Sequence, residues 1–296
     1  MIVLNYLLAG LIWIISIMPF FVLYGISDFL FFFFYYIIRY RKKVVFENLR
    51  NSFPDKPEKE INKIARKFYH NLCDLIVEII KEKTVSSEKI LKRIRYKNLE
   101  IVERMYKEGR SVLAVCGHIG NWEWVGVTGI FFMKNKFFAV VKPLTSKFWN
   151  EYMSKLRVRF AGEGLIPFKQ TLRVLLKNKE YTTLTLLAGD QTPTKSEIEY
   201  WTTFLNQDTP LFVGIEKIAK SLDMAVLFFN IQREKRGHYV VEISILTEAP
   251  KNTSENEITE MHVRALEKVI SEHPENWLWS HRRWKHKRIF EQGMQN

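Results

Sequence analysis

The chain has 296 residues, 47% of them hydrophobic, which suffices for one large folded domain and excludes a disordered chain. Its net charge is +13, from 45 Lys and Arg against 32 Asp and Glu, so acidic partners such as nucleic acid, anionic lipid, a phosphorylated substrate or an acidic protein are favoured. The two cysteines, Cys73 and Cys116, form neither a disulfide framework nor a zinc pattern, and we interpret them as small buried hydrophobic residues in a reducing compartment.

Residues 1–27 contain no charged side chain, and this apolar stretch is long enough to cross a membrane, which takes about 20 residues. Asp28 interrupts the stretch, apolar sequence resumes, and a basic cluster follows at Arg39, Arg41, Lys42 and Lys43. The pattern predicts a membrane anchor over residues 1–40, either one tilted span or a shorter insertion followed by an interfacial helix. A buried hydrophobic hairpin in a soluble protein is the alternative. A cleaved signal peptide fits poorly because no basic residue precedes the apolar stretch.

The positive-inside rule assigns residues 41–296 to the cytoplasmic side, as a second unit. Apolar residues recur at helical spacing from Ile61 to Ile80 and predict an amphipathic helix that packs on the domain or lies near lipid headgroups. Further along, predicted strands and helices alternate. The strands cover residues 111–117, 136–143, 181–190, 224–233 and 238–246, and the helices cover 121–134, 146–160, 169–179, 210–223 and 255–274. This alternation predicts an α/β fold with a mostly parallel central sheet flanked by helices.

Three ionisable side chains follow predicted strands directly: His118, Lys142 and Asp190. Ligands of parallel α/β folds bind at the carboxyl ends of the strands. We therefore expect these three residues to lie at one site.

The turn after the first of these strands carries the pair His118 and Glu123. Asn121 is a good N-cap, so a helix should begin at Trp122 with Glu123 in its first turn. The carboxylate could then approach one imidazole nitrogen and leave the other free, which would make His118 a general base near neutral pH. A hydrogen-bonded structural histidine and a glutamate at a helix N-terminus are the alternative.

Several other chemistries lack their motifs in this sequence. There is no H-E-x-x-H and no cluster of His or Cys at ligand spacing, so no metal site is expected. There is no G-x-S-x-G for a serine nucleophile. Walker A and G-x-G-x-x-G motifs are also absent, so nucleotide and NAD sites have no support.

The order of four segments resembles the lipid A late acyltransferases, in the glycerolipid and lysophospholipid acyltransferase superfamily. The segments are "RYRKKVVFENLRNSFP", "GHIGNWEW" with its H-x4-acid motif, "AGDQTP" and "NWLWSHRRWKHK". One segment departs from the family pattern: Val141-Lys142-Pro143 stands where many members have Tyr-Arg-Pro. A lysine keeps the charge but loses the bidentate fork of an arginine.

The resemblance implies an acyltransferase at the cytoplasmic face of a Gram-negative inner membrane. The donor would be an acyl thioester, on acyl carrier protein or coenzyme A, with no other cofactor. The acceptor would be a hydroxyl of a lipid A precursor. His118 would remove the hydroxyl proton, and Glu123 would hold the imidazole tautomer and stabilise the imidazolium.

The remaining candidate site residues would bind substrate. Arg157 and Arg159 lie on the helix after the next strand. The resemblance implies that one of them faces the site, and we expect Arg157, unless both are solvated surface charges. Asp190 would orient Lys142, Arg157 or a cation bound to a substrate phosphate, unless it caps a turn. The full set of expected substrate-binding residues is Asn121, Lys142, Arg157, Arg159, Asp190, Gln191, Arg282 and Arg283, with Thr192 beside the pocket.

The segment from Trp277 to Arg288 interleaves aromatic residues with cations. Nucleic-acid-binding proteins and membrane interfaces both use this mixture. With an apolar anchor elsewhere in the chain, we expect a membrane interface, an anionic lipid surface as partner, no nucleic acid, and Arg282 and Arg283 on phosphates. The alternatives to lipid A acylation are acyl transfer to another lipid (a lysophospholipid, aminolipid or glycolipid) and a non-catalytic membrane-tethered binder of anionic lipid or nucleic acid.

Overall fold

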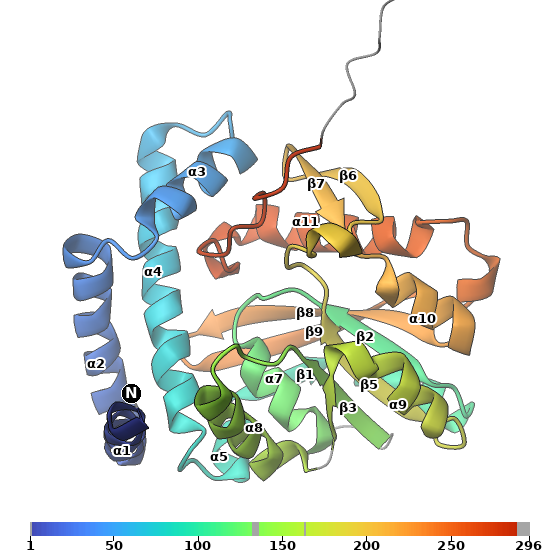
Figure 1. The fold of residues 1–296 in the computed structure, drawn as a ribbon, viewed down its shortest axis with the longest axis horizontal. Coiled ribbons are helices and arrows are strands. Elements are labelled where there is room, and N and C mark those ends of the chain that lie inside the picture. Colours follow the sequence, from blue (N-terminus) through green and yellow to red (C-terminus); the bar gives the residue numbers. More distant parts are fainter. Residues whose placement is uncertain (1, 132–135, 163, 289–296) are drawn as a thin grey trace, which may run out of the picture.

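A computed structural model describes residues 2–131, 136–162 and 164–288 of the chain. Its centre is a seven-stranded sheet in the order β1–β9–β8–β2–β5–β3–β4 (Figure 1). Neighbouring strands run parallel except β8 and β9, which form the predicted hairpin. The strands are β1 (Ile94–Lys97), β2 (Val112–Cys116), β3 (Lys136–Val141), β4 (Leu165–Pro167), β5 (Thr183–Ala188), β8 (Ala225–Lys235) and β9 (His238–Thr247). The predicted α/β fold is confirmed.

Strand β2 lies in the middle of this sheet, and all five of its residues are buried. Leu113 and Val115 pack into the core on one face of the sheet, whereas Val112, Ala114 and Cys116 pack into the core on the other. A strand covered on both faces needs an uninterrupted apolar run, which is what this segment provides.

Helices cover both faces of the sheet. One face carries α4 (Glu58–Lys81), α9 (Thr171–Lys177), α10 (Gly214–Leu222) and α11 (Glu257–Glu272). The other carries α5 (Ser87–Leu91), α6 (Leu99–Lys107), α7 (Trp122–Thr128) and α8 (Lys147–Ala161). Helix α3 (Lys42–Ser52) packs on α4, which is the amphipathic helix predicted from Ile61 to Ile80.

The structure differs from the predicted elements at several places. Strands β6 (Tyr200–Phe204) and β7 (Gln207–Leu211) form a small antiparallel hairpin that was not predicted. The helix predicted from residue 210 therefore begins only after β7. Leu205 and Asn206 take positive φ angles of 50° and 60° at the turn of the hairpin, as a tight two-residue hairpin turn requires. Neither residue is a glycine, so the usual turn signal is missing.

Other boundaries also moved. Strands β1 and β4 were not predicted, and β4 has only three residues, too few for a periodic pattern. Helix α7 ends at Thr128 and continues as a 3-10 turn over Gly129–Phe131. The end of the predicted helix 121–134 lies outside the described residues.

The N-terminal segment forms α1 (Ile2–Ile17), α2 (Phe20–Phe32) and a π-helical turn (Phe33–Ile37). By length and composition, Phe20–Ile37 could cross a membrane. Helix α2 runs beside α4 (Figure 1) and buries Leu23, Ser27 and Phe31. The apolar N-terminal segment is therefore packed on the α/β domain.

A buried carboxylate ties α4 to the β8–β9 hairpin and is a point where stability can be tested. Asp74 accepts hydrogen bonds from Ser27 (2.6 Å), from Nη2 of Arg233 (2.6 Å) and from Nε and Nη2 of Arg236 (2.9 and 2.6 Å). Asp74→Asn leaves two guanidinium groups without this counter-charge, and we expect the free energy of unfolding to fall by about 3 kcal/mol. Urea unfolding in mild detergent, followed by tryptophan fluorescence, measures the change.

The control is Glu234→Gln, which removes a carboxylate from an exposed pair with Arg95. We expect this change to cost less than about 1 kcal/mol. Equal effects of the two substitutions would contradict the role given to Asp74.

Candidate active site

The turn between β2 and α7 holds His118 at the end of the central strand. Gly120 takes a φ of +57°, in the left-handed region that favours glycine. A Cβ on Gly117 would lie 2.5 Å from Cδ1 of Leu266, so a larger residue would require the Leu266 side chain to move. The two glycines therefore allow the tight turn that brings His118 to the sheet edge.

Asn121 is the N-cap of α7, as predicted. Its Oδ1 accepts a hydrogen bond from the backbone N–H of Trp124 at 2.9 Å, and its Nδ2 donates to Oε2 of Glu78 at 2.7 Å. Because Asn121 is fully buried and both ends of its amide are used, it supports the turn and does not face a substrate.

Asp190, at the end of β5, is the carboxylate that binds the imidazole of His118. Oδ1 of Asp190 lies 2.5 Å from Nδ1 of His118, and its Oδ2 accepts the backbone N–H of His118 at 2.9 Å. Nε1 of Trp277 also donates to Oδ2, at 2.7 Å. Glu123 was the carboxylate predicted to bind the imidazole, but the partner in the structure is Asp190. Strands β2 and β5 are parallel neighbours in register, which is why their ends meet.

These contacts shift the pKa values of both groups. Burial alone would lower the pKa of His118, but the charge and hydrogen bond of Asp190 outweigh it and raise the pKa above its usual 6.5. Burial would raise the pKa of Asp190, but His118 and the hydrogen-bond donors hold it well below its usual range. The pair therefore stabilises the imidazolium. Its contribution to folding is complete below the unfolded pKa of His118 and is lost as the pH rises through the folded pKa.

The other imidazole nitrogen faces a cavity of about 460 Å³. Nε2 of His118 lies 3.0 Å from Nε2 of Gln191, so the amide donates to it when Nδ1 carries the proton. Predominantly apolar side chains line this cavity, among them Val127, Val140, Leu165, Phe168, Leu186 and Phe212. An imidazole with one nitrogen held by a carboxylate and the other at an apolar cavity can act as a general base when a substrate hydroxyl replaces the Gln191 amide at Nε2.

Glu123 lines the same cavity but binds Arg157. Nε and Nη2 of Arg157 donate to Oε2 and Oε1 of Glu123 at 2.9 and 2.7 Å, a bidentate pair from α8 to α7. Burial would lower the pKa of Arg157, but the charge of Glu123 raises it above its usual value. Arg157 thus lines the cavity that His118 also lines, and it stays charged there.

The other predicted cations are divided between the site and the domain surface. Lys142 is exposed and lines the cavity. Arg159 lies elsewhere: its Nη2 donates to the carbonyl of Val85 at 2.7 Å and its Nη1 to the carbonyl of Glu82. Arg159 therefore joins α8 to the segment after α4 and does not contact the site.

The predicted membrane interface over Trp277 to Arg288 is wrong for its three tryptophans and for Arg283. Trp277, Trp279 and Trp284 are buried in the core. Arg283 is only 1% exposed, Nη2 donates to the carbonyl of Pro210 at 2.8 Å, and burial lowers its pKa to about 10. It cannot contact a headgroup phosphate from this position. Arg282 is exposed but does not line the cavity.

This C-terminal segment instead supports the turn between β2 and α7. The backbone N–H of Gly120 donates to the carbonyl of Asn276 at 3.1 Å, and the N–H of Leu278 donates to the carbonyl of His118 at 3.2 Å. Thr192 is bound to the same C-terminal segment, since its hydroxyl donates to the carbonyl of Arg283 at 2.7 Å. The tryptophans pack in the core, and Trp277 holds Asp190 by a hydrogen bond. The alternation of aromatic residues and cations in the sequence did not indicate this structural role.

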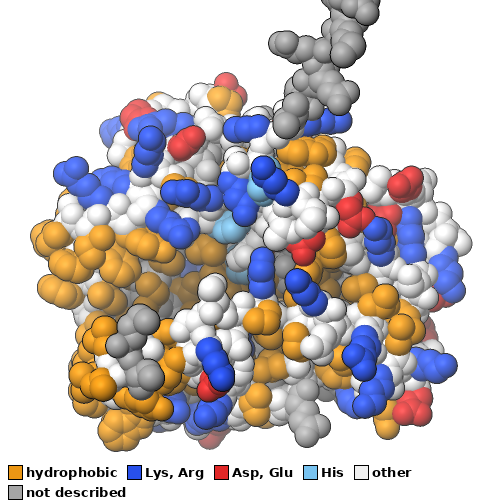
Figure 2. Space-filling view, viewed as in Figure 1, with side chains coloured by type: hydrophobic (Ala, Val, Ile, Leu, Met, Phe, Trp, Pro, Cys, Tyr) orange, Lys and Arg blue, Asp and Glu red, His pale blue; other side chains and the backbone are white. Residues whose placement is uncertain are grey.

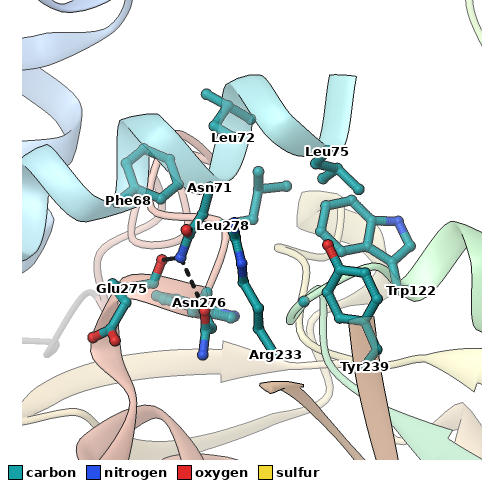
Figure 3. A pocket seen from close by; sticks show the side chains of 12 residues that line it. Phe68, Asn71, Leu72, Leu75, Trp122, Arg233, Tyr239, Glu275, Asn276 and Leu278 are labelled. Carbon is teal, nitrogen blue, oxygen red and sulfur yellow. Dashed lines mark hydrogen bonds between the residues drawn. The ribbon is translucent and has the colours of Figure 1, made fainter. Parts of the chain in front are cut away.

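Trp122 also lines a second, much smaller cavity of about 20 Å³ (Figure 3). Asn71 and Arg233 line it together with Glu275 and Tyr239. This volume holds about one water molecule. Of these two cavities, only the larger has room for a substrate.

The assignment of Asp190 can be tested by titrating His118. Asp190→Asn removes the charge that outweighs burial, so we expect the pKa of His118 to fall below its wild-type value. NMR titration of the ring carbon protons measures it, with His118→Gln used to assign the signal. Asp208→Asn, at an exposed position, should leave the pKa unchanged. An unaltered His118 titration in Asp190→Asn would refute the pairing.

Comparison with known proteins places the chain in a family. The family model described as "Bacterial lipid A biosynthesis acyltransferase" matches residues 1–286. The chain is also 23% identical over 241 residues to "Lipid A biosynthesis acyltransferase 2" of Shigella flexneri, an alignment that covers 78% of this chain and 74% of the relative. The chain therefore belongs to the bacterial lipid A biosynthesis acyltransferase family and is an acyltransferase.

Proposed function

We propose that this acyltransferase of lipid A biosynthesis moves a fatty acyl chain from a thioester to a hydroxyl of a lipid A precursor. The thioester would be carried by acyl carrier protein or coenzyme A. One observation carries the proposal: Nδ1 of His118 is bound to the buried Asp190, and its Nε2 faces a largely apolar cavity of about 460 Å³.

The proton transfers follow from this arrangement. Nε2 of His118 takes the proton of the acceptor hydroxyl while the oxygen attacks the thioester carbonyl. Asp190 stabilises the resulting imidazolium through Nδ1. When the tetrahedral intermediate collapses, the carbon–sulfur bond breaks and the imidazolium returns the proton to the leaving thiolate. An ester and a free thiol are the products, and His118 is again neutral.

Arg157 is the group best suited to stabilise the negative charge of the tetrahedral oxygen. Its guanidinium lines the cavity, and two hydrogen bonds to Glu123 fix its direction. A cation that is held in place before the reaction loses no reorganisation energy when charge develops. Under this proposal Glu123 acts mainly by positioning Arg157, and its charge also favours the imidazolium of His118.

The proposed location is the cytoplasmic face of a Gram-negative inner membrane. The apolar N-terminal helices and the net charge of +13 support contact with an anionic lipid surface. Exposed Lys142 at the cavity supports contact with an anionic group, either a phosphate of the acceptor or an acidic group of the acyl carrier protein. A lysine binds such groups as a point charge, without bidentate geometry.

The catalytic assignment predicts the activities of four variants. His118→Ala should lower kcat/KM by about 10³, because general base catalysis is lost. Asp190→Asn should lower it by about 10-fold or more, because the imidazolium loses its counter-charge. His273→Ala and Asp208→Asn, both at exposed positions, should retain wild-type rates. Transfer from radiolabelled acyl carrier protein to lipid measures the rates, and a His118→Ala rate within a factor of ten of wild type would refute the proposed base.

The acceptor can be identified in cells. Deletion of the gene should remove one fatty acyl unit from lipid A, and mass spectrometry of extracted lipid A measures the loss. Restoration by the wild-type chain and not by His118→Ala would tie the loss to this site. Unchanged lipid A together with a shift in a phospholipid, aminolipid or glycolipid would reassign the acceptor.

A further inference from the structure

The first two helices and the turn after them expose a large apolar surface, which we call the N-terminal apolar face. Its exposed side chains are Val3, Leu4, Tyr6, Leu7, Leu8, Leu11, Trp13, Ile14, Ile17, Met18, Phe21, Phe29, Phe32, Phe33, Tyr36, Ile37, Ile38 and Tyr40. Figure 2 shows hydrophobic side chains gathered where Figure 1 places α1 and α2. A contiguous apolar patch of this kind marks a contact with lipid or protein.

The opposite side of α2 is packed on α4. Leu23, Ser27, Phe31 and Tyr35 are buried and recur every four residues, so they form one stripe along the helix. The Phe31 ring stacks on His70 of α4 with 3.4 Å between ring centroids. Only one side of α2 is therefore available to lipid.

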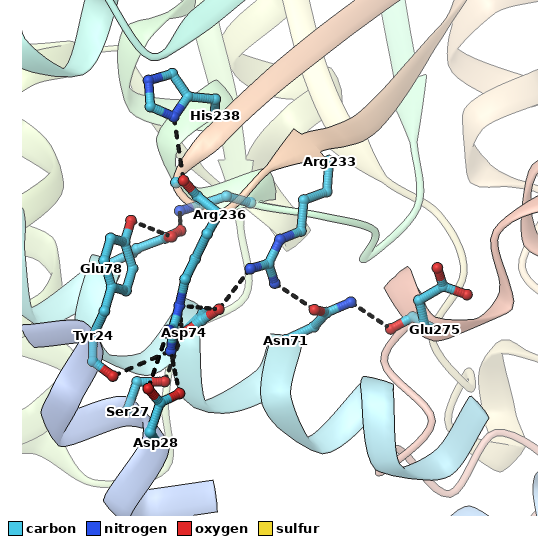
Figure 4. Close-up of polar contacts among 12 residues, drawn as sticks. Tyr24, Ser27, Asp28, Asn71, Asp74, Glu78, Arg233, Arg236, His238 and Glu275 are labelled. Atoms are coloured by element: carbon cyan, nitrogen blue, oxygen red, sulfur yellow. Dashed lines mark hydrogen bonds and ion pairs between the residues drawn. The ribbon is translucent and has the colours of Figure 1, made fainter. Parts of the chain in front are cut away.

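Charged groups lie at the middle of α2, where it meets the domain (Figure 4). Asp28 lies at the centre of Phe20–Ile37, the segment long enough to cross a membrane, and its side chain is 54% exposed. It accepts a hydrogen bond from Nη2 of Arg236 at 2.6 Å. The same guanidinium binds the buried Asp74, and Arg236 also donates to the carbonyl of Tyr24 at 3.1 Å. The ion cluster thus fastens the midpoint of α2 to the β8–β9 hairpin.

Helix α1 is fastened at its C-terminal end. Nζ of Lys81 donates to the carbonyls of Ser16 and Met18 at 2.7 and 2.8 Å, which places a cation at the negative end of the helix. Its 16 residues extend about 24 Å, less than the hydrocarbon thickness of about 30 Å. Figure 1 shows α1 end-on and α2 from the side, so the two axes diverge strongly.

These contacts are incompatible with α2 as an upright span. If α2 crossed the bilayer, the half of α4 packed along it would enter the hydrocarbon with Arg66, Asp74 and Lys81. The ion cluster of Asp28 and Arg236 would then lie at the bilayer centre, and so would the end of the β8–β9 hairpin. Charges at that depth cost several kcal/mol each, and a sheet edge exposed to lipid leaves backbone groups unpaired.

We propose that α1 and α2 lie in the plane of a single anionic lipid leaflet, with the N-terminal apolar face inserted from one side. The exposed Arg39, Arg41 and Lys43 follow this face directly and match the charge of the headgroups. The proposal rests on the membrane association of the proposed function. The in-plane orientation extends the proposed function, because helices inserted into one leaflet would hold the α/β domain beside the lipids proposed as acceptors.

Depth measurements on α2 test the in-plane orientation. Phe21 and Phe32 are 78% and 53% exposed, and eleven residues apart they lie on the same side of the helix, about 16 Å along its axis. The full-length variants Phe21→Cys and Phe32→Cys, each with a nitroxide spin label, are bound to vesicles of phosphatidylcholine and phosphatidylglycerol. The native Cys73 and Cys116 are buried and should not react. Collisions with oxygen and with a water-soluble nickel complex report the depth of each label.

We expect both labels at similar, shallow depths within one leaflet. Glu255→Cys, at an exposed position of the domain, serves as the aqueous reference. Depths that differ by about 16 Å between positions 21 and 32 would overturn the in-plane orientation and indicate a span. Labels at positions 21 and 32 that collide with the nickel complex as often as the Glu255→Cys label does would refute any lipid contact of α2.

The topology of the whole chain gives an independent result. An epitope tag fused before Met1 and the label site at Glu255→Cys should lie on the same side of sealed vesicles, whereas a span would place them on opposite sides. Acyl transfer measured on the same preparations separates the two proposals. Active protein with the tag and residue 255 on opposite sides of the vesicle refutes only the in-plane orientation. Inactive wild-type protein with α1 and α2 in the leaflet refutes only the proposed activity.

Discussion

The site depends on a carboxylate that is buried in the domain and still charged. Burial of an unpaired carboxylate is costly, and Asp190 avoids the cost because three donors surround it: two from His118 and one from Trp277. His118 comes from the end of β2, Asp190 from the loop after β5 and Trp277 from the C-terminal segment. Their convergence fixes the direction of the imidazole, and removal of any one would leave charge or polar atoms unpaired. The geometry of the candidate site and its local stability therefore have the same origin.

The fold was predictable because its strongest signals are local. The all-apolar run of Val112–Cys116 indicated a central strand, and the strand–glycine–histidine–asparagine order indicated the turn and the N-cap of α7. Strand ends of a parallel sheet meet at one edge, so His118, Lys142 and Asp190 were rightly placed together. The β6–β7 hairpin escaped notice because Leu205 and Asn206 turn the chain without a glycine.

The pairing within the site was harder to predict. H-x4-E spacing brings Glu123 near His118 along the chain, but α7 directs the carboxylate toward Arg157 of α8, where two hydrogen bonds hold it. A contact across two parallel strands, such as that of Asp190, depends on sheet order and register, which spacing does not contain. The tryptophans after Asn276 had the composition of a membrane interface, and only tertiary packing shows that they form part of the core.

The C-terminal segment has a consequence for biosynthesis. His118 is translated long before Trp277 and Leu278, the residues that complete the support of its turn. While the chain is still on the ribosome, residues 2–37 can already form their apolar helices, whereas the turn of His118 lacks the segment that holds it. The imidazole therefore takes its final orientation only after residues 277 and 278 have been added.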